Sequence, residues 1–496
     1  MSDFSQLLSC HIHSKDIKTY ALAQYCGLDR SNMYKIINGK RKPSSRELVI
    51  KICKFMQLSH AEQKEMEQAY EITLIGHDTY YRRKAVIDFF NNFRLSKLNL
   101  PVLSELNTEI LFEKGSVTLN TMAEVNRSLL YIISLEAKKS NGTIDLLVQP
   151  DCDFLMNILA AENYDCSQTT IRHIICLNNS TSESSTYPNY NLHCLEKILP
   201  LYSNVDKYNC FYYYDHIDSK CSKFTLFPYV IITSQFACLL TGDMTQGILT
   251  NAPESLTLFK DIFNQYLSMA SPLLRPINDV TEQISYLNNI SHVVRSGYSF
   301  QMVPCLTPYL THDILDKYII QELPNRSEFI QAMDNYIKVF LSSYMTPDNI
   351  TYIFSLNGVK KFLDTGRVSE YPYDIYHPLE MTDRIHLIRK LMLNLPIQNY
   401  RVLKKDIGHL DNEIFLQVTQ PMGYIMFSTP QDHRLIYLDI EEPGLLYTFW
   451  DFCETLDDAL FYTTTEAIEI LRDLINNTKN LDKYFTYFPS FRTSYS

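Results

Sequence analysis

The sequence predicts a multidomain chain, with an all-α head of five short helices followed by a large mixed α/β body that could hold two α/β units. Its 496 residues are enough for about three domains. Charge is divided unevenly, since residues 1–100 carry 16 basic and 10 acidic side chains while the whole chain has a net charge of −11. Near residue 110 the hydrophobic spacing changes from helical to alternating strand-like and helical runs. A basic head on an acidic body is expected when one end of a chain binds nucleic acid.

Glycine and cysteine spacing excludes several classes of enzyme and cofactor site. The 13 glycines form neither GxGxxG nor GxSxG, and Ile248 stands where a phosphate-binding loop needs lysine. The 12 cysteines form no CxxC pair and have no zinc-ligand spacing. We therefore expect no cofactor, no metal site and no catalytic residue. Free thiols, together with the lack of a signal peptide or bilayer-spanning segment, predict a cytoplasmic protein without membrane contact.

Two helix start signals lie between residues 44 and 62. Ser44 followed by Glu47 predicts a capping box at the start of the fourth helix, and Ser59 followed by Glu62 predicts another for the fifth. The apolar residues after each signal recur at helical spacing, so both helices are expected to face one core.

Residues 19–38 have the spacing of two short helices joined by a tight turn. A small residue on the inner face of the first helix lets the second pack closely, and a glycine at the corner allows a left-handed backbone. An aspartate can cap the second helix, which has apolar residues on one side. The residues expected in these structural roles are Ala23, Gly27, Asp29, Met33 and Ile36. This is the pattern of a helix-turn-helix.

The segment resembles the DNA-binding domains of the phage-repressor class of xenobiotic-response-element (XRE) regulators, over about residues 4–70. The matching residues are Leu22-Ala23, Gly27, Asp29-Arg30-Ser31, Met33, Ile36 and Asn38-Gly39-Lys40. The resemblance implies a bacterial transcription regulator that places its second helix in the major groove. At Thr19 the family often has a glutamine that contacts the DNA backbone, and threonine is shorter.

The second helix of the motif supplies the expected DNA contacts. The first residues of a recognition helix reach base edges, where Arg can pair with guanine and Asn with adenine. The expected base contacts are Arg30, Ser31, Asn32 and Lys35, and the expected phosphate contacts are Thr19, Asn38, Lys40, Arg41 and Lys42. Between residues 30 and 54 there are eight basic side chains and one acidic side chain, so binding should weaken steeply with salt.

Alternatives remain open within the head. A small helical packing module could carry the same basic face without binding DNA, although the corner glycine, the caps and the Asn-Gly-basic ending together favour DNA binding. Tyr34 could stack against DNA or cover the fourth helix, and packing is the favoured interpretation.

The expected domains are residues 1–72 (helix-turn-helix), 73–110 (helical connector), 111–275 and 276–496 (two α/β domains). A helix is expected at 78–94, and a surface loop at 178–191. In the body, strands are expected at 144–148, 171–176, 211–214, 229–240, 352–355, 424–428 and 435–440, and helices at 253–267, 329–343, 383–393 and 466–475. Residues 237–263 and 436–456 both follow strands with an aromatic-bearing helix, which suggests a duplicated architecture.

Chemistry-bearing clusters in the body are few. Tyr214-Asp215-His216 and Asp406-Gly408-His409-Asp411 bring acids near histidine, but acid–base catalysis needs such groups at hydrogen-bond distance in a pocket. Surface or turn positions are the preferred interpretation. The run 210–214 could line a ligand pocket or form a strand with one buried face. Either use suits a chain with 35 tyrosines, because tyrosine combines an apolar ring with a polar tip.

The leading functional hypothesis is a transcriptional regulator that binds double-stranded DNA as a homodimer, since one helix-turn-helix contacts one half-site. Its body would sense an unknown small-molecule, peptide or protein effector. The second hypothesis is a DNA-binding interaction scaffold, such as an antitoxin or defence component. The third is an enzyme with a DNA-binding head.

Overall fold

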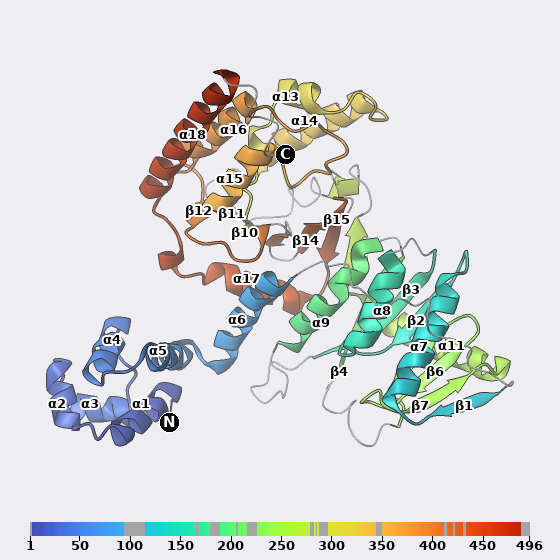
Figure 1. Cartoon of the computed structure of the whole chain (residues 1–496), viewed down its shortest axis with the longest axis horizontal. Helices are drawn as coiled ribbons and strands as arrows, with labels where there is room; N and C mark the ends of the chain where they lie inside the picture. Colours follow the sequence, from blue (N-terminus) through green and yellow to red (C-terminus); the bar gives the residue numbers. More distant parts are fainter. Residues whose placement is uncertain are drawn as a thin grey trace. The chain divides into compact units, whose positions relative to one another are not determined.

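The protein folds as two compact units, an all-helical head and a mixed α/β body with two sheets, which confirms the predicted fold class (Figure 1). The first unit contains residues 1–85, and the second contains residues 86–181 and 190–496. The structure is a computed structural model, and it describes residues 2–93, 115–164, 168–178, 189–204, 207–215, 226–277, 282–283, 285–286, 296–343, 350–410, 414–419, 422–429 and 433–487.

The head contains the five predicted helices, α1 (Asp3–Ser14), α2 (Thr19–Tyr25), α3 (Arg30–Ile37), α4 (Arg46–Phe55) and α5 (His60–Ile75). Each helix contributes apolar side chains to one core. The residues that are fully removed from solvent there are Leu8, Leu22, Met33, Val49, Ile52 and Met66. Hydrophobic burial of this kind is the main source of stability for such short helices, which are marginal in isolation.

The start signals of α4 and α5 had different outcomes. The capping box of Ser59 and Glu62 is present with both of its hydrogen bonds. For α4 the prediction of Ser44 was wrong, because the helix begins at Arg46 and Ser45 is the residue before it. The Ser45 hydroxyl accepts the N–H of Leu48 at 3.3 Å. The cap belongs to the residue directly before the first helical one, whose side chain reaches the amide three positions on.

Helix α4 ends on a residue with an unfavourable backbone conformation. Gln57 has a φ of 51°, and its side chain is exposed. Its N–H donates to the Lys54 carbonyl, and the Leu58 N–H donates to the Cys53 carbonyl, each at 3.1 Å. This is the Schellman ending, which glycine fills without a Cβ penalty.

We expect Gln57→Gly to stabilise the head by about 1 kcal/mol, because the left-handed conformation costs a non-glycine residue roughly that amount. Hydrogen exchange of the α4 and α5 amides in the full chain measures the change. Gln57→Ala, which keeps the Cβ, is the control and should give no such gain. Equal protection in all three proteins would show that the turn is not strained.

The second unit begins within α6 (His77–Asn92), close to the helix predicted at residues 78–94. The buried side of its last turns is aromatic. Phe90 lies 4.7 Å from Phe300 between ring centroids, and Phe89 lies 5.7 Å from Phe449. These contacts fix the end of α6 to the second sheet of the body.

The first sheet has eight strands in the order β1-β7-β6-β5-β2-β3-β4-β8. Its strands are β1 (Ser116–Leu119), β2 (Thr143–Leu147), β3 (Thr170–Asn178), β4 (Tyr208–Asp215), β5 (Tyr229–Ile232), β6 (Ala237–Leu240), β7 (Gly247–Thr250) and β8 (Ser271–Pro272). The associated helices are α7 (Met122–Ala137), α8 (Asp153–Tyr164), α9 (Tyr190–Ile198), the 3-10 helix η2 (Leu199–Asn204) and α11 (Pro253–Met269). Strands β2, β3 and β4 are parallel, as expected where helices connect them.

The single strand predicted at residues 229–240 was wrong, because the segment is a hairpin of β5 and β6. The Thr233 N–H donates to the Phe236 carbonyl at 2.8 Å, and the Thr233 hydroxyl accepts the N–H of Phe236 at 3.0 Å. A threonine that bonds its local backbone in this way favours a turn over a continued strand.

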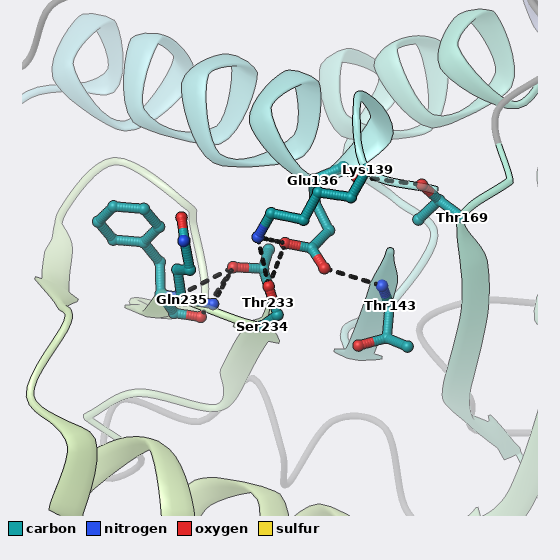
Figure 2. Close-up of polar contacts among 8 residues, drawn as sticks. Glu136, Lys139, Thr143, Thr169, Thr233, Ser234 and Gln235 are labelled. Atoms are coloured by element: carbon teal, nitrogen blue, oxygen red, sulfur yellow. Dashed lines mark hydrogen bonds and ion pairs between the residues drawn. The ribbon is translucent and has the colours of Figure 1, made fainter. Parts of the chain in front are cut away.

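The buried carboxylate of Glu136 fixes this turn to the end of α7 (Figure 2). Glu136, which is 1% exposed, accepts hydrogen bonds from the Lys139 ammonium at 2.8 Å, the Ser234 hydroxyl at 2.7 Å and the Thr143 N–H at 2.9 Å. Burial opposes ionisation, but these three donors outweigh it and lower the pKa of Glu136. The carboxylate therefore joins the end of α7, the start of β2 and the β5–β6 turn.

The second sheet has seven strands in the order β12-β11-β10-β13-β14-β15-β9. They are β9 (Leu274–Ile277), β10 (Gly297–Gln301), β11 (Ile350–Ser355), β12 (Tyr400–Leu403), β13 (Phe415–Thr419), β14 (Gly423–Ser428) and β15 (Leu435–Ile440). Its helices are α13 (His312–Tyr318), α14 (Arg326–Ser343), α15 (Leu356–Thr365), α16 (Met381–Asn394), α17 (Pro443–Glu454) and α18 (Thr464–Tyr487). Helix α18 extends beyond the predicted 466–475. The other predicted body strands and helices are confirmed within a few residues at their ends.

The two sheets share one topology, which confirms the suggested duplication at the level of strand order. Each has three parallel strands (β2-β3-β4 and β10-β11-β12) followed by an antiparallel run (β5-β6-β7 and β13-β14-β15). The first strand of each half pairs antiparallel with the last of that run, β1 with β7 and β9 with β15. A short antiparallel contact then closes the far edge, through β8 in one half and a Leu403–Phe461 bridge in the other.

Candidate nucleic-acid interface

Helix α3 buries one side and exposes the other. Met33 and Ile36 are 0% and 3% exposed and pack into the head core, as predicted. Arg30, Ser31 and Lys35 lie on the exposed side. The helix is therefore held by its apolar side, and its polar side is accessible to a ligand as large as a DNA duplex.

The corner between α2 and α3 has the predicted construction. Gly27 has a φ of 70°, and the Leu28 N–H donates to the carbonyl of Ala23 at 2.9 Å, which completes a Schellman ending of α2. Ala23 itself is 1% exposed, so the small residue does lie at the packed side of α2. Asp29 caps α3 by accepting the N–H of Asn32 at 2.8 Å.

The Asn38-Gly39-Lys40 ending is a second Schellman motif. Asn38 is the C-cap of α3, and Gly39 has a φ of 70°. The N–H groups of Lys40 and Arg41 both donate to the Lys35 carbonyl, at 2.8 and 3.1 Å. The chain thus turns tightly around the helix end, and the exposed Lys40 and Arg41 side chains follow directly after the recognition helix.

Asn32 is engaged within the protein. Its amide nitrogen donates to Oδ2 of Asp29 at 2.5 Å, and its amide oxygen accepts from the Arg41 guanidinium at 3.0 Å. To read adenine the amide must exchange both hydrogen bonds for contacts with the base. In the free protein Asn32 instead connects the start of α3 to the basic segment that follows it.

Tyr34 is the feature that the sequence interpretation underestimated. Its side chain is 39% exposed, so it is only partly packed, and the choice between stacking on DNA and covering the fourth helix stays a prediction. The Arg30 guanidinium lies 5.5 Å from the ring centroid. Hydrogen bonds from Arg30 and then Thr19 lower the pKa of Tyr34. The ring therefore stands between an expected base contact and an expected phosphate contact, and its place one helical turn after Arg30 was the available signal.

The remaining expected phosphate contacts differ in their surroundings. Asn38 is exposed, and Thr19 is half-buried beside Tyr34. The Lys42 ammonium donates to the Leu74 carbonyl at 3.3 Å, near the C-terminal end of α5. A cation is stabilised at a helix C-terminus, so Lys42 must leave this partner before it can neutralise a phosphate.

This surface offers positive charge and hydrogen-bond donors to a ligand. Arg30 and Lys35 provide donors along the exposed side of α3, and Lys40 and Arg41 add positive charge at its end. Arginine at the start of a recognition helix matches guanine O6 and N7, and the basic segment beyond it matches phosphates. The structure thus exposes Arg30, Ser31 and Lys35 on α3 and Lys40 and Arg41 directly after it, whereas Thr19, Asn32 and Lys42 are partly buried or bonded within the head.

The body candidates from the sequence do not form a comparable site in the described residues. His216 and Asp411 lie outside those residues, and the described Asp406 accepts a hydrogen bond from the Asn357 amide at 2.9 Å. Tyr214 donates its hydroxyl to Glu442. Strand β4 alternates buried and half-buried residues, and half-buried Phe211 and Tyr213 pack against another apolar cluster, which favours the strand interpretation of 210–214.

Two kinds of site are absent from the described part of the chain. No group of three or more His, Cys, Asp or Glu side chains there could hold a metal ion. None of the helices in the described ranges has the length and hydrophobicity that a bilayer crossing requires.

The geometry of the head agrees with its family. Residues 8–62 match the family model of the Cro/C1-type helix-turn-helix DNA-binding domain. The matched segment begins within α1 and ends within the capping box of α5, so it includes the whole α2–corner–α3 motif. The chain therefore carries a DNA-binding domain of the Cro/C1 type at its N-terminal end. No curated protein matches the chain.

Distant similarity extends to solved structures. TrmBL2, an archaeal chromatin protein described with a novel mode of DNA binding, is 11% identical, with 49% of this chain and 84% of that chain covered and a TM-score of 0.22. Phosphatidylserine synthase from Haemophilus influenzae Rd KW20 is 11% identical, with 76% and 93% covered and a TM-score of 0.24. Polyphosphate kinase from Porphyromonas gingivalis is 12% identical, with 73% and 55% covered and a TM-score of 0.21.

Proposed function

We propose that the protein is a sequence-specific transcriptional regulator that binds double-stranded DNA through α3 and acts as a homodimer in the bacterial cytoplasm. Its body, in this proposal, has no catalytic role and senses a small-molecule, peptide or protein effector. The observation that carries the proposal is α3 itself, whose apolar side is locked into the head core while Arg30, Ser31 and Lys35 remain exposed.

The charge distribution supports the head as the DNA-binding end. The described head surface combines the exposed side of α3 with Lys40 and Arg41, whereas the chain as a whole carries a net charge of −11. An acidic body is repelled by phosphates, so the duplex is best approached by the basic end.

The direct experiment is the selection of bound sequences from a random duplex pool by the full chain, followed by mapping of bound sites in the genome. A dimeric regulator should enrich a near-palindrome with half-sites separated by one helical turn or a multiple of it. Affinity for the selected site should fall steeply with salt. Enrichment of no sequence over the random pool would contradict sequence-specific recognition.

Pairing of two chains is supported by an apolar stripe on α11. Leu258, Ile262, Tyr266 and Met269 recur at helical spacing and are 56%, 38%, 38% and 69% exposed. An exposed stripe of large apolar residues is costly in water and is typical of an interface. Binding to two half-sites requires two heads, so a second copy of the chain is the partner that we expect to cover this stripe. In a symmetric dimer each chain presents the same stripe to the other.

Ile262→Glu is expected to shift the full-length protein from dimer to monomer, because it places a charge at the centre of the stripe. Sedimentation velocity measures the change, and affinity for the two-half-site operator should fall at least about tenfold with the loss of the second head. Thr257→Glu is the matched control, since Thr257 is exposed on the same helix but lies on another face than the stripe. If Ile262→Glu sediments like the wild-type chain, the α11 surface is not the interface.

A further inference from the structure

A cavity lies against the second sheet of the body. It is bounded by β10, β11, β13, β14 and β15 on one side and by Met333 and Tyr336 of α14 on another. The space between the lining atoms is about 560 Å³, including its open mouth. That is room for a few water molecules or one small ligand.

Three side chains in the cavity wall have buried polar atoms without a hydrogen-bond partner. They are Oε2 of Glu370, Nε2 of Gln417 and the hydroxyl of Tyr437. Gln417 is 5% exposed and Tyr437 is 2% exposed. An unsatisfied buried polar group costs about 1–3 kcal/mol, so three of them around one space point to a missing partner.

The other polar atom of Glu370 and that of Gln417 are already hydrogen-bonded. Oε1 of Glu370 accepts from the Gln301 amide at 3.4 Å, and Oε1 of Gln417 accepts from the Tyr424 hydroxyl at 3.3 Å. These contacts leave Oε2 of Glu370 and Nε2 of Gln417 without a partner in residues that line the cavity. No Lys, Arg or His is among the described residues that line it, so the carboxylate lacks a positive counter-charge there.

We propose that this cavity binds a small amino alcohol, a ligand that carries both a protonated amine and a hydroxyl oxygen. The ammonium donates to Oε2 of Glu370 and supplies the missing positive charge. The hydroxyl oxygen accepts from Nε2 of Gln417 and shares a hydrogen bond with Tyr437. The ammonium also gains a cation–π contact with the face of a tyrosine ring in the wall.

Other ligand classes fit the lining less well. An anion would meet a carboxylate and no cation. A neutral diol would satisfy Gln417 and Tyr437 but leave the charge of Glu370 uncompensated. A simple alkylamine would compensate the charge but give Gln417 no acceptor. Burial raises the pKa of Glu370 to about 7, as expected for a carboxylate that has no cation beside it.

The test is a calorimetric titration of the full chain, without DNA, with three small probes. Ethanolamine has both groups, ethylene glycol lacks the charge, and ethylamine lacks the oxygen. At pH 8 ethanolamine should bind at least about tenfold more tightly than either of the others, since each loses one charge-assisted or buried hydrogen bond. In Glu370→Gln the preference over ethylene glycol should disappear, and in Gln417→Leu the preference over ethylamine should disappear.

The exposed Glu322→Gln is the matched control and should keep both preferences. Circular dichroism melting curves show whether each variant is folded, and Glu370→Gln should remain so because it removes an uncompensated buried charge. Equal affinity for the three probes, no heat with any of them, or preferences that survive in both cavity variants would overturn the proposal. Because DNA is absent from the titration, such a failure leaves the proposed function of the head unaffected.

Discussion

Arg30→Ala is expected to weaken binding to the selected operator by about 1–3 kcal/mol, which is roughly 5- to 150-fold. The reason is that Arg30 is exposed at the first position of α3, where a guanidinium can reach guanine O6 and N7. The loss should be specific, so the preference at one base position should relax while the rest of the site is still recognised. Fluorescence anisotropy with the operator and its single-base variants measures both effects.

Lys40→Ala is the comparison that separates the two kinds of contact. Lys40 follows the Schellman ending of α3, so its removal should weaken all duplexes alike and reduce the salt slope by about one. Lys64→Ala, on the exposed face of α5, controls for loss of charge and should change little. If Arg30→Ala and Lys40→Ala had the same sequence profile, the division into base and phosphate contacts would be wrong.

Gly39→Ala is expected to destabilise the head by about 3 kcal/mol, the second large effect. A Cβ at this position would lie 2.8 Å from the Ser5 hydroxyl and 3.2 Å from the Ser2 nitrogen, at a φ of 70°. The left-handed strain and the overpacking each cost about 1–2 kcal/mol. Ser5 is fully buried and donates its hydroxyl to the Ser2 carbonyl, so it has little room to move. Hydrogen exchange of the head amides in the full chain measures the loss.

Gly27→Ala is the matched control for this change. Gly27 has the same φ of 70°, but a Cβ there would meet no atom within 4 Å. Its substitution should cost only the backbone strain, about 1–2 kcal/mol. Equal losses in the two variants would show that a Cβ at residue 39 meets no steric hindrance from Ser2 and Ser5.

The head was predictable from the sequence because its signals are local. A cap, a glycine in the left-handed region and an apolar repeat act within a few residues, so α3 and its corner follow from residues 27–36. The misplaced cap at Ser44 and the hairpin at 229–240 are errors of the same local kind. In each place two adjacent residues, Ser44 and Ser45 or Thr233 and Ser234, have hydroxyl groups that can bond nearby backbone groups. The sequence does not show which of the two forms the bond.

The surroundings of the contact residues could not be predicted in this way. Lys42 bonds the carbonyl of Leu74, and the Glu370 and Gln417 side chains meet across one cavity from separate elements. Such pairings depend on how distant segments pack, and the sequence carries no spacing that signals them. The surroundings of Tyr34 were partly predictable, because the sequence shows its position relative to Arg30 but not the residues that pack around its ring.

The repeated strand order also lets the halves be compared position by position. In the first half, His173 of β3, Tyr208 of β4 and Tyr202 of η2 are all fully buried, and the rings of Tyr202 and Tyr208 lie 4.9 Å apart between centroids. His173 bonds Tyr208 and the Val148 carbonyl at 2.8 and 2.9 Å, and burial lowers its pKa to about 4, so it stays neutral. The second half has the cavity beside α14. Substitutions at His173, Tyr202 or Tyr208 are therefore constrained by packing, whereas substitutions around the cavity are constrained by what it admits.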